Sequence, residues 1–289
     1  MNGVINIDKP GGMTSHDVVA RVRRVAKQKR VGHTGTLDPD ATGVLLVCLG
    51  TATRIADLLA DAGKRYRCKL VLGAETDTED SSGTVTAETD AAHIDEAALR
   101  GMLPEFTGEI MQVPPMVSAV HHEGKRLYEL ARAGITVERA ARPVTIDRLE
   151  LVSFEPGARP SAILDIGCSK GTYVRTLCSD IGRVLGVGGH MGSLRRTAVG
   201  VFTDETAVAL DALDESTLVE KLVPASDALD LPRVHGSPAD AEDIRHGRAI
   251  TIRGFVDGNV VQIVDGEGNL LALARIADGR AHPYKVFAG

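Results

Sequence analysis

The sequence predicts a mixed α/β protein with a small all-β module at its C-terminal end. Over the first 230 or so residues, segments with apolar residues at helical spacing alternate with segments at strand spacing. Beyond Leu231-Pro232 the pattern changes to short apolar runs separated by glycine, at Ala249–Ile252, Asn259–Val264 and Leu270–Ile276. We therefore expect a larger domain over residues 1–229 and a module of about 60 residues over 230–289, within the usual lower range of domain size.

The composition is that of a globular protein, with 43% apolar and 25% charged residues in a chain of 289. No apolar run approaches the roughly 18–20 residues of a membrane span. The N-terminus lacks a basic region followed by a long apolar stretch, so no signal peptide is expected. No two of the four cysteines have CxxC spacing, which argues against a zinc site or a disulfide framework. A cytoplasmic location without membrane contact fits these features.

The charge is unevenly distributed along the chain. The net charge is −6, yet residues 1–70 carry 12 Lys and Arg against 6 Asp and Glu. Such asymmetry favours a polyanionic partner, although an ordinary solvated helix face would also explain it.

The N-terminal part predicts a strand, a capped helix, a loop, a buried strand, a second helix and a third strand. The helix follows Thr14 or Ser15 as N-cap and carries a basic face that leads into the loop. The expected elements are a strand at Val4–Ile7, a helix around Val18–Ala26, a strand at Val44–Leu49, a helix at Ile55–Ala62 and a strand at Lys64–Leu72.

The loop Val31–Gly43 combines three glycines with Asp38-Pro39. Glycine permits tight turns and close approach of the backbone to a ligand. Pro39 restricts its own φ and pushes Asp38 toward an extended conformation. An aspartate held in this way suits a catalytic carboxylate, because catalysis rewards groups that are already in position. From spacing alone, an ordinary turn is the alternative.

Tyr66 is one of few aromatic residues and is flanked in sequence by Lys64, Arg65 and Arg67. An aromatic ring beside cations suits stacking on a base next to a phosphate. Packing of the ring against a neighbouring strand is the alternative.

The middle of the chain predicts further strands and helices. The adjacent His121 and His122 do not predict a metal site, because neighbouring residues of a strand point in opposite directions. The expected elements are a loop or hairpin over 75–90, a helix at Ile94–Leu103, a basic amphipathic helix from Lys125 to Arg132, strands at Val144–Phe154 and Ala162–Ile166, a helix starting within Lys170–Leu177, and a glycine-rich basic turn at Gly188–Arg196.

Six motifs together resemble the TruB-type tRNA pseudouridine synthases. They occur in the family's order along essentially the whole chain. They are Asp8–Ser15, Gly32–Pro39 with Ala41–Gly43, Lys64–Tyr66, Gly124–Ala131, Lys170–Arg175 and Leu194–Arg196. The tail from Leu231 resembles, more loosely, the family's RNA-binding PUA domain. Val117 departs from the pattern, which has an aromatic residue after Pro114-Pro115-Met116.

The resemblance implies a mixed α/β catalytic domain around a largely antiparallel sheet, with a PUA domain appended. It implies cleavage of the C1′–N1 bond of uridine 55 and rejoining of the base through C5, without a cofactor or metal. The target base must leave its stack. Asp38 would be the essential carboxylate, either attacking C1′ or abstracting a sugar proton.

The resemblance also assigns roles to other residues. His33 would fill the space left in the T loop, Tyr66 would stack on the flipped base, and Arg175 would pair with Asp38. Tyr173 and Leu194 would shape the pocket, while Lys9 and Pro10 would support the active-site loop. The residues expected to contact the RNA backbone are Lys64, Arg65, Lys125 and Arg126.

The partner implied is the T arm of tRNA, with the acceptor end as a candidate contact of the PUA-like module and no obligatory protein partner. Two other functions remain open. An RNA-binding protein that folds tRNA without chemistry would not require Asp38. An RNA-guided synthase of the dyskerin type would need a guide RNA and protein partners, against which the compact layout argues.

Overall fold

The computed structural model describes residues 1–118 and 120–287, except for the side chain of His122. The prediction that His121 and His122 do not share a metal ion therefore lies outside the described residues. Residues 1–39, 44–60 and 200–289 form one compact unit, unit 1, and residues 40–43 and 61–199 form the other, unit 2. The predicted domain boundary at residue 230 lies inside unit 1 and stays a prediction. Within the described ranges, no helix is both long and apolar enough to span a bilayer.

Unit 1 begins with strands and a helix that bury one common core. β1 (Gly3–Lys9) lies between β14 (Val208–Ala209) and β3 (Thr42–Leu49), and β2 (Val31–His33) pairs antiparallel with β3. The core includes Ile5, Ile7, Val18, Val22, Leu45 and Val47. The remaining short elements are η1 (Gly50–Ile55), α2 (Ala56–Asp61), β13 (Phe202–Thr203), η3 (Asp204–Thr206), η4 (Leu210–Ala212) and α6 (Glu215–Lys221).

Helix α1 (Ser15–Val25) confirms the helix and the basic face that the sequence predicts. Thr14 is its N-cap and forms a capping box with Asp17, which satisfies free N–H groups of the first turn. Val18 and Val22 are buried on one side, while Arg21 and Arg24 are exposed on the other.

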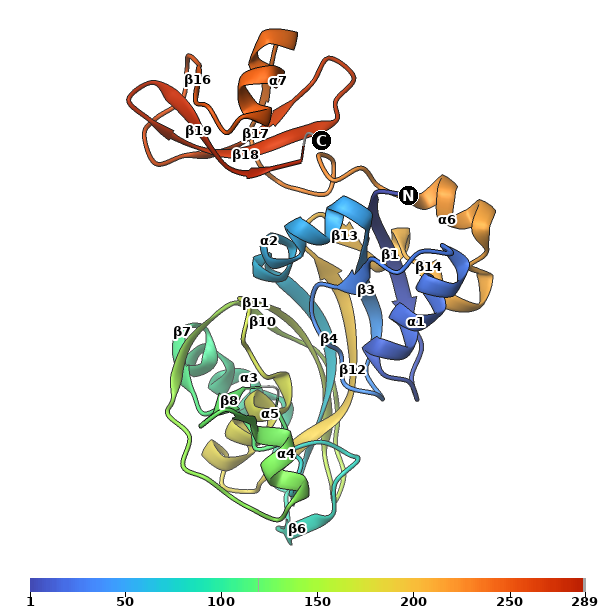
Figure 1. The fold of residues 1–289 in the computed structure, drawn as a ribbon. Coiled ribbons are helices and arrows are strands. Elements are labelled where there is room, and N and C mark those ends of the chain that lie inside the picture. Colours follow the sequence, from blue (N-terminus) through green and yellow to red (C-terminus); the bar gives the residue numbers. More distant parts are fainter. Residues whose placement is uncertain (119, 288–289) are drawn as a thin grey trace. The chain divides into compact units, whose positions relative to one another are not determined.

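The C-terminal module is a five-stranded sheet that also belongs to unit 1. Helix α7 (Pro238–Arg245), capped by Ser237, lies beside this sheet (Figure 1), and its Ile244 is buried in the core of the sheet. Its sequence did not predict a helix, because α7 buries few large apolar residues. The strand order is β15 (Arg233–His235), β17 (Val260–Val264), β18 (Leu270–Ala277), β19 (Arg280–Val286) and β16 (Ile250–Thr251).

Unit 2 is built on strands that pair antiparallel with each neighbour, in agreement with the expected sheet. Their order is β12 (Gly189–Val199), β4 (Lys64–Leu72), β11 (Ser161–Cys168), β10 (Arg142–Glu155) and β7 (Gly108–Gln112). Helix α5 (Val174–Val184) packs against β12 (Figure 1). The other elements are β5 (Ala74–Thr76), β6 (Val85–Glu88), α3 (Glu96–Met102), η2 (Leu103–Phe106), β8 (His121–His122), β9 (Lys125–Arg126) and α4 (Leu127–Arg132).

The predicted turn at Gly188–Arg196 is wrong, because residues 189–196 belong to strand β12. Its glycines let the helix approach the strand closely. A Cβ on Gly189 would lie 3.0 Å from the carbonyl oxygen of Cys178 in α5, and one on Gly182 would lie 2.3 Å from the backbone of Gly188. The sequence signal for a turn was therefore a signal for close backbone packing.

One predicted helix begins later than expected, and another begins within its predicted range. Lys125 and Arg126 form the short strand β9, and α4 starts only at Leu127. The helix expected to start within Lys170–Leu177 starts at Val174, with Tyr173 as its N-cap, which confirms that prediction.

Candidate active site

The backbone on the N-terminal side of Asp38 is fixed by Ser15. Leu37 is 4% exposed, and its N–H donates to Oγ of Ser15 at 2.9 Å. The same hydroxyl donates to the carbonyl oxygen of Leu37 at 3.2 Å. Ser15 is itself buried at the start of α1. Both polar groups of Leu37 are thus held by one side chain of the helix.

The backbone on the C-terminal side of Asp38 is fixed by Lys9. This lysine is fully buried, and its Nζ donates to the carbonyl oxygens of Pro10 and Pro39, each at 2.8 Å. The N–H of Gly12 donates to the same oxygen of Pro39 at 3.0 Å. The half-buried Asp38 therefore lies between two fixed residues, as a positioned carboxylate requires.

His33 ends strand β2 in the same unit and is half-buried. Its ring meets the ring of the exposed His16 edge-on, with centroids 5.2 Å apart and planes at 89°. Unit 1 thus contains Asp38, His33, Lys9 and Pro10 of the predicted site residues.

Tyr66 lies in β4 of unit 2 and is 8% exposed. Because side chains alternate along a strand, it shares a face with Lys64 and Cys68, whereas Arg65 and Arg67 lie on the opposite face. Nε and Nη2 of Arg67 donate to the carboxylate of Asp165 at 2.8 and 2.9 Å. Arg65 and Arg67 are thus neighbours of Tyr66 in sequence but lie on the other face of the strand.

Lys64 is half-buried, and its Nζ donates to the carbonyl oxygen of Ala62 at 2.7 Å. Burial, reinforced by the positive charge of Arg196, lowers the pKa of the Lys64 ammonium to about 8. Its charge is therefore sensitive to pH in a range where lysine is ordinarily fully protonated.

Arg175 lies in the first turn of α5 and is 5% exposed. Its Nη2 donates to the carbonyl oxygen of Val117 at 2.8 Å, and its Nη1 lies 3.6 Å from Oδ2 of Asp80. Sequence reasoning missed Asp80, because the acidic stretch 75–90 offered no recognisable motif. The pairing of Arg175 with Asp38 stays a prediction.

Asp80 is itself held by its own loop. Its Oδ1 accepts hydrogen bonds from Oγ1 of Thr78 at 2.8 Å and from N and Oγ of Ser82 at 3.0 and 2.5 Å. A carboxylate restrained in this way offers the guanidinium of Arg175 a fixed partner.

Tyr173 and Leu194 also lie in unit 2, and both are half-buried. The backbone N–H of Tyr173 donates to Oε1 of Gln112 at 2.8 Å, and Nε2 of Gln112 donates back to the Tyr173 carbonyl at 3.1 Å. Leu194 lies in β12 opposite Cys68 of β4. Gln112 thus fixes the start of α5, and with it the position of Arg175.

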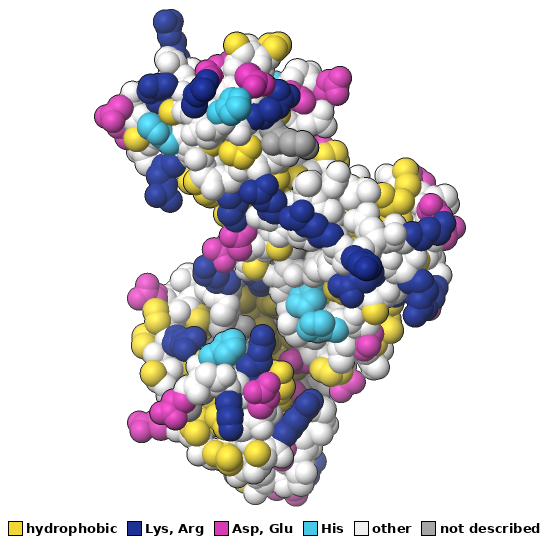
Figure 2. Space-filling model, in the orientation of Figure 1, with side chains coloured by type: hydrophobic (Ala, Val, Ile, Leu, Met, Phe, Trp, Pro, Cys, Tyr) yellow, Lys and Arg dark blue, Asp and Glu magenta, His cyan; other side chains and the backbone are white. Residues whose placement is uncertain are grey.

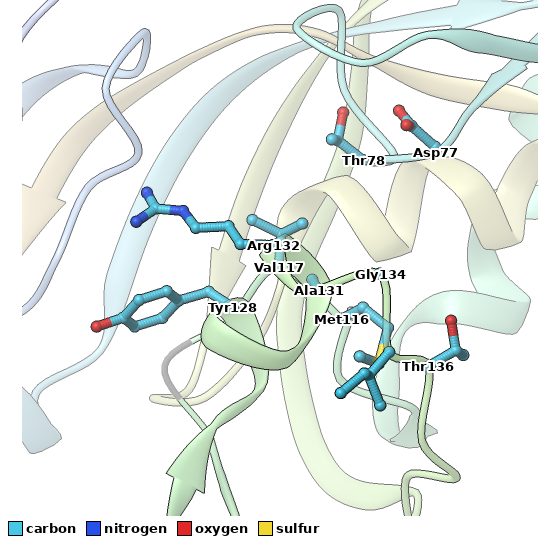
Figure 3. A pocket seen from close by; sticks show the side chains of 10 residues that line it. Asp77, Thr78, Met116, Val117, Tyr128, Ala131, Arg132, Gly134 and Thr136 are labelled. Atoms are coloured by element: carbon cyan, nitrogen blue, oxygen red, sulfur yellow. The ribbon is translucent and has the colours of Figure 1, made fainter.

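A pocket of about 420 Å³ opens in unit 2 between α4 and the loop that precedes Asp80. Figure 3 shows Arg132 and Tyr128 extending from α4 on the same side, and the Arg132 guanidinium lies 5.4 Å from the Tyr128 ring centroid. Val117 also lines the pocket, so an aromatic side chain there would narrow it. The lining is Asp77, Thr78, Met116, Val117, Tyr128, Ala131, Arg132, Gly134, Ile135 and Thr136.

Of the remaining predicted residues, Lys125 and Arg126 are exposed in β9, and Arg65 is exposed in β4. Figure 2 shows many Lys and Arg side chains on the face in view.

In the part of the chain that the structure describes, no three His, Cys, Asp or Glu side chains are grouped to hold a metal ion.

Comparison with known proteins gives two family matches. The model described as "TruB family pseudouridylate synthase (N terminal domain)" matches residues 23–174, and "tRNA pseudouridylate synthase B C-terminal domain" matches residues 175–231.

Proteins named tRNA pseudouridine synthase B are similar over most of the chain. The one from Symbiobacterium thermophilum is 51% identical over 254 residues, covering 88% of this chain and 84% of that protein. The one from Moorella thermoacetica is 46% identical over 288 residues, covering 95% and 93%. Among solved structures, a chain of a Cbf5–Nop10–Gar1 complex is 30% identical with a TM-score of 0.75, covering 99% of this chain and 84% of that chain.

Proposed function

The chain belongs to the TruB family of pseudouridylate synthases, and we propose that it converts uridine 55 in the T loop of tRNA to pseudouridine. The reaction is an isomerisation. The C1′–N1 bond breaks, the base turns, and a C1′–C5 bond forms while the C5 proton is lost and N1 gains one. Atoms and electrons balance without an oxidant or reductant.

Asp38 supplies the essential carboxylate. The observation that carries this assignment is the fixation of both neighbours of Asp38, by Ser15 at Leu37 and by Lys9 and Gly12 at Pro39. A carboxylate held in this way reaches the ribose of a bound nucleotide without first ordering its loop.

The other site residues act on the flipped nucleotide. Tyr66 stacks on the uracil, and Tyr173 and Leu194 shape its pocket. Arg175 pairs with Asp38 while its other contacts, to Val117 and Asp80, support the guanidinium. His33 fills the space that the base leaves in the T loop.

Cationic side chains hold the tRNA backbone. The exposed Lys125 and Arg126 are candidates in unit 2, together with Lys64 and Arg65. We assign residues 1–229 to the catalytic domain and 230–289 to a PUA-like RNA-binding domain that contacts the acceptor end. The five-stranded sheet over residues 233–286 supports this division. The enzyme acts in the cytoplasm.

The chain needs neither a guide RNA nor a protein partner in this proposal. Its identity to proteins named tRNA pseudouridine synthase B reaches 51%, against 30% to the Cbf5 complex chain. Incubation of the purified chain with an unmodified tRNA transcript alone, followed by mapping of pseudouridine, tests this directly. A requirement for added guide RNA would contradict it.

The variant Asp38→Asn tests the role of the carboxylate. Pseudouridine formation should be abolished, while tRNA affinity stays within about tenfold, because one catalytic group is lost without loss of the binding surface. A protein that only folds tRNA would not require Asp38, so the comparison of wild type and Asp38→Asn also tests that alternative function. An Asn variant that still forms pseudouridine at the wild-type rate would refute the assignment.

A further inference from the structure

Glu79 lies in the loop between β5 and β6, next to Asp80. Its backbone is in the left-handed region, with φ of 64°, which costs free energy for a residue other than glycine. Hydrogen bonds hold it there, since its N–H donates to the carbonyl of Thr76 at 3.2 Å and its carbonyl accepts from N–H of Met191 at 3.0 Å. The loop is thereby tied to strand β12.

The side chain of Glu79 reaches helix α5. Its Oε2 accepts a hydrogen bond of 2.5 Å from Oγ1 of Thr176, which is 4% exposed and follows Arg175 directly. The charged and titratable groups around it are the cations Arg175 and Arg139, and the acidic or thiol groups Asp80, Asp180 and Cys178.

The balance of these surroundings disfavours the ionised form. Burial raises the pKa of Glu79 above its ordinary value, and the Thr176 hydroxyl and the Arg175 charge only partly oppose this. A carboxyl whose pKa is higher in the folded than in the unfolded chain lowers the free energy of unfolding once it is ionised, and that loss disappears as the pH falls through the raised pKa. The ionised Glu79 thus does not serve stability.

We propose that Glu79 is a positioning residue for the isomerisation: its carboxylate holds Thr176 and attracts Arg175, so that the first turn of α5 presents the guanidinium in one orientation. This inference rests on the proposed function, in which Arg175 acts on Asp38. Asp80 and Glu79 hold the same turn of the helix from one loop, Asp80 through the guanidinium and Glu79 through the neighbouring hydroxyl.

The test is Glu79→Gln, which keeps the size and an acceptor oxygen but removes the charge. In steady-state assays on a tRNA transcript at neutral pH, kcat should fall about tenfold to a hundredfold, the range that slight misplacement of a catalytic group causes. The tRNA affinity should stay unchanged, and Tm should be equal to or higher than that of the wild type.

Glu88→Gln is the matched control. Glu88 is exposed in the neighbouring β6 and pairs with Arg159, so its replacement should leave kcat unchanged. A Glu79→Gln variant with wild-type kcat, or one whose lost activity follows a lowered Tm, overturns the inference.

The pH dependence of the reaction rate distinguishes a positioning role of Glu79 from a purely structural one, which would not change it. The ratio of wild-type to Glu79→Gln rates should be large at neutral pH and approach one as the pH falls through the raised pKa, because protonation makes the two side chains alike. A ratio that does not change with pH overturns the inference.

Thr176→Val tests the route to the helix. If Glu79 acts through Thr176, the losses in Thr176→Val and Glu79→Gln should be less than additive in the double variant, and Thr176→Ser should restore activity. Fully additive losses would overturn the route. An inactive wild type would instead refute the proposed function, so the two failures are distinguishable.

Discussion

At the scale of single residues, Ser15 fixes the loop that carries Asp38, because its one hydroxyl satisfies both backbone groups of Leu37. In Ser15→Ala the buried N–H and C=O lose their partner. Leaving a buried polar group unpaired costs about 1–3 kcal/mol. We expect the free energy of unfolding in urea to fall by about that amount, and kcat to fall as well, because the loop that carries Asp38 loosens.

Ser216→Ala is the control for this change. The hydroxyl of Ser216 is exposed and donates to Asp214 at 2.8 Å, so its removal should alter neither quantity. Full kcat in Ser15→Ala would show that the loop keeps its conformation without this serine.

The lowered pKa of Lys64 predicts that tRNA affinity depends on pH. Its pKa of about 8 means that the free protein loses this charge as the pH rises through that value. If the ammonium contacts a phosphate, tRNA affinity should be weaker at pH 9 than at pH 7. Lys64→Arg should remove this part of the pH dependence, because arginine stays protonated. The same affinity change with pH in both proteins would exclude Lys64 from the RNA contact.

At the scale of elements, the contact of α5 with β12 depends on glycine. A Cβ on Gly182 would lie 2.3 Å from the backbone of Gly188. Backbone atoms cannot move aside as the end of a flexible side chain can. Gly182→Ala should therefore reduce the free energy of unfolding by about 1–3 kcal/mol or more, as overpacking does. Chemical denaturation measures this.

Gly101→Ala in α3 is the matched control with the opposite sign. Nothing lies within 4 Å of a Cβ at Gly101, and its φ is not in the positive region. A helical Gly→Ala change without a clash should stabilise by about 0.5–1 kcal/mol. Equal effects of the two substitutions would mean that the close packing of α5 is not rigid.

The elements that the sequence predicted well are those with strong local signals. The buried strand β3 and the capped helix α1 follow from an apolar run and from Thr14 with Asp17. Strand β12 was missed because its glycines serve close packing against helix α5 and strand β4, and glycines in a sequence indicate a turn as readily as close packing.

The candidate site was predictable to a similar extent. The stiffness of the Asp38 loop could be expected from Pro39, but its fixation by Lys9 and Ser15 depends on contacts between separate segments. The role of Asp80 beside Arg175 is equally non-local. The opposite orientation of Arg65 and Tyr66 could have been deduced, because alternation along a strand was already evident.

At the scale of the whole molecule, an acidic chain must gather its cations to bind RNA. Binding releases counterions, so the logarithm of affinity falls with the logarithm of salt concentration by roughly 0.7–0.9 per phosphate contact. Replacing Lys125 and Arg126 together by alanine should flatten this slope by about one to two units, whatever the tRNA sequence.

Titration of tRNA affinity from low to moderate salt measures both slopes. His33→Ala serves as a control that should leave the slope nearly unchanged, since its proposed contact is with the T loop and not with phosphate. If the double variant has the wild-type slope, strand β9 does not face the RNA.

The two backbone amides that close the Asp38 loop also act as built-in reporters of its opening. The N–H groups of Gly12 and Leu37 are bonded to the Pro39 carbonyl and to the Ser15 hydroxyl, so they exchange with deuterium only when those bonds open. Exchange at these positions should remain slow in Asp38→Asn and become fast in Ser15→Ala. Deuterium uptake thus separates an enzyme that has lost its reactive group from one whose loop has come apart, with no substrate present.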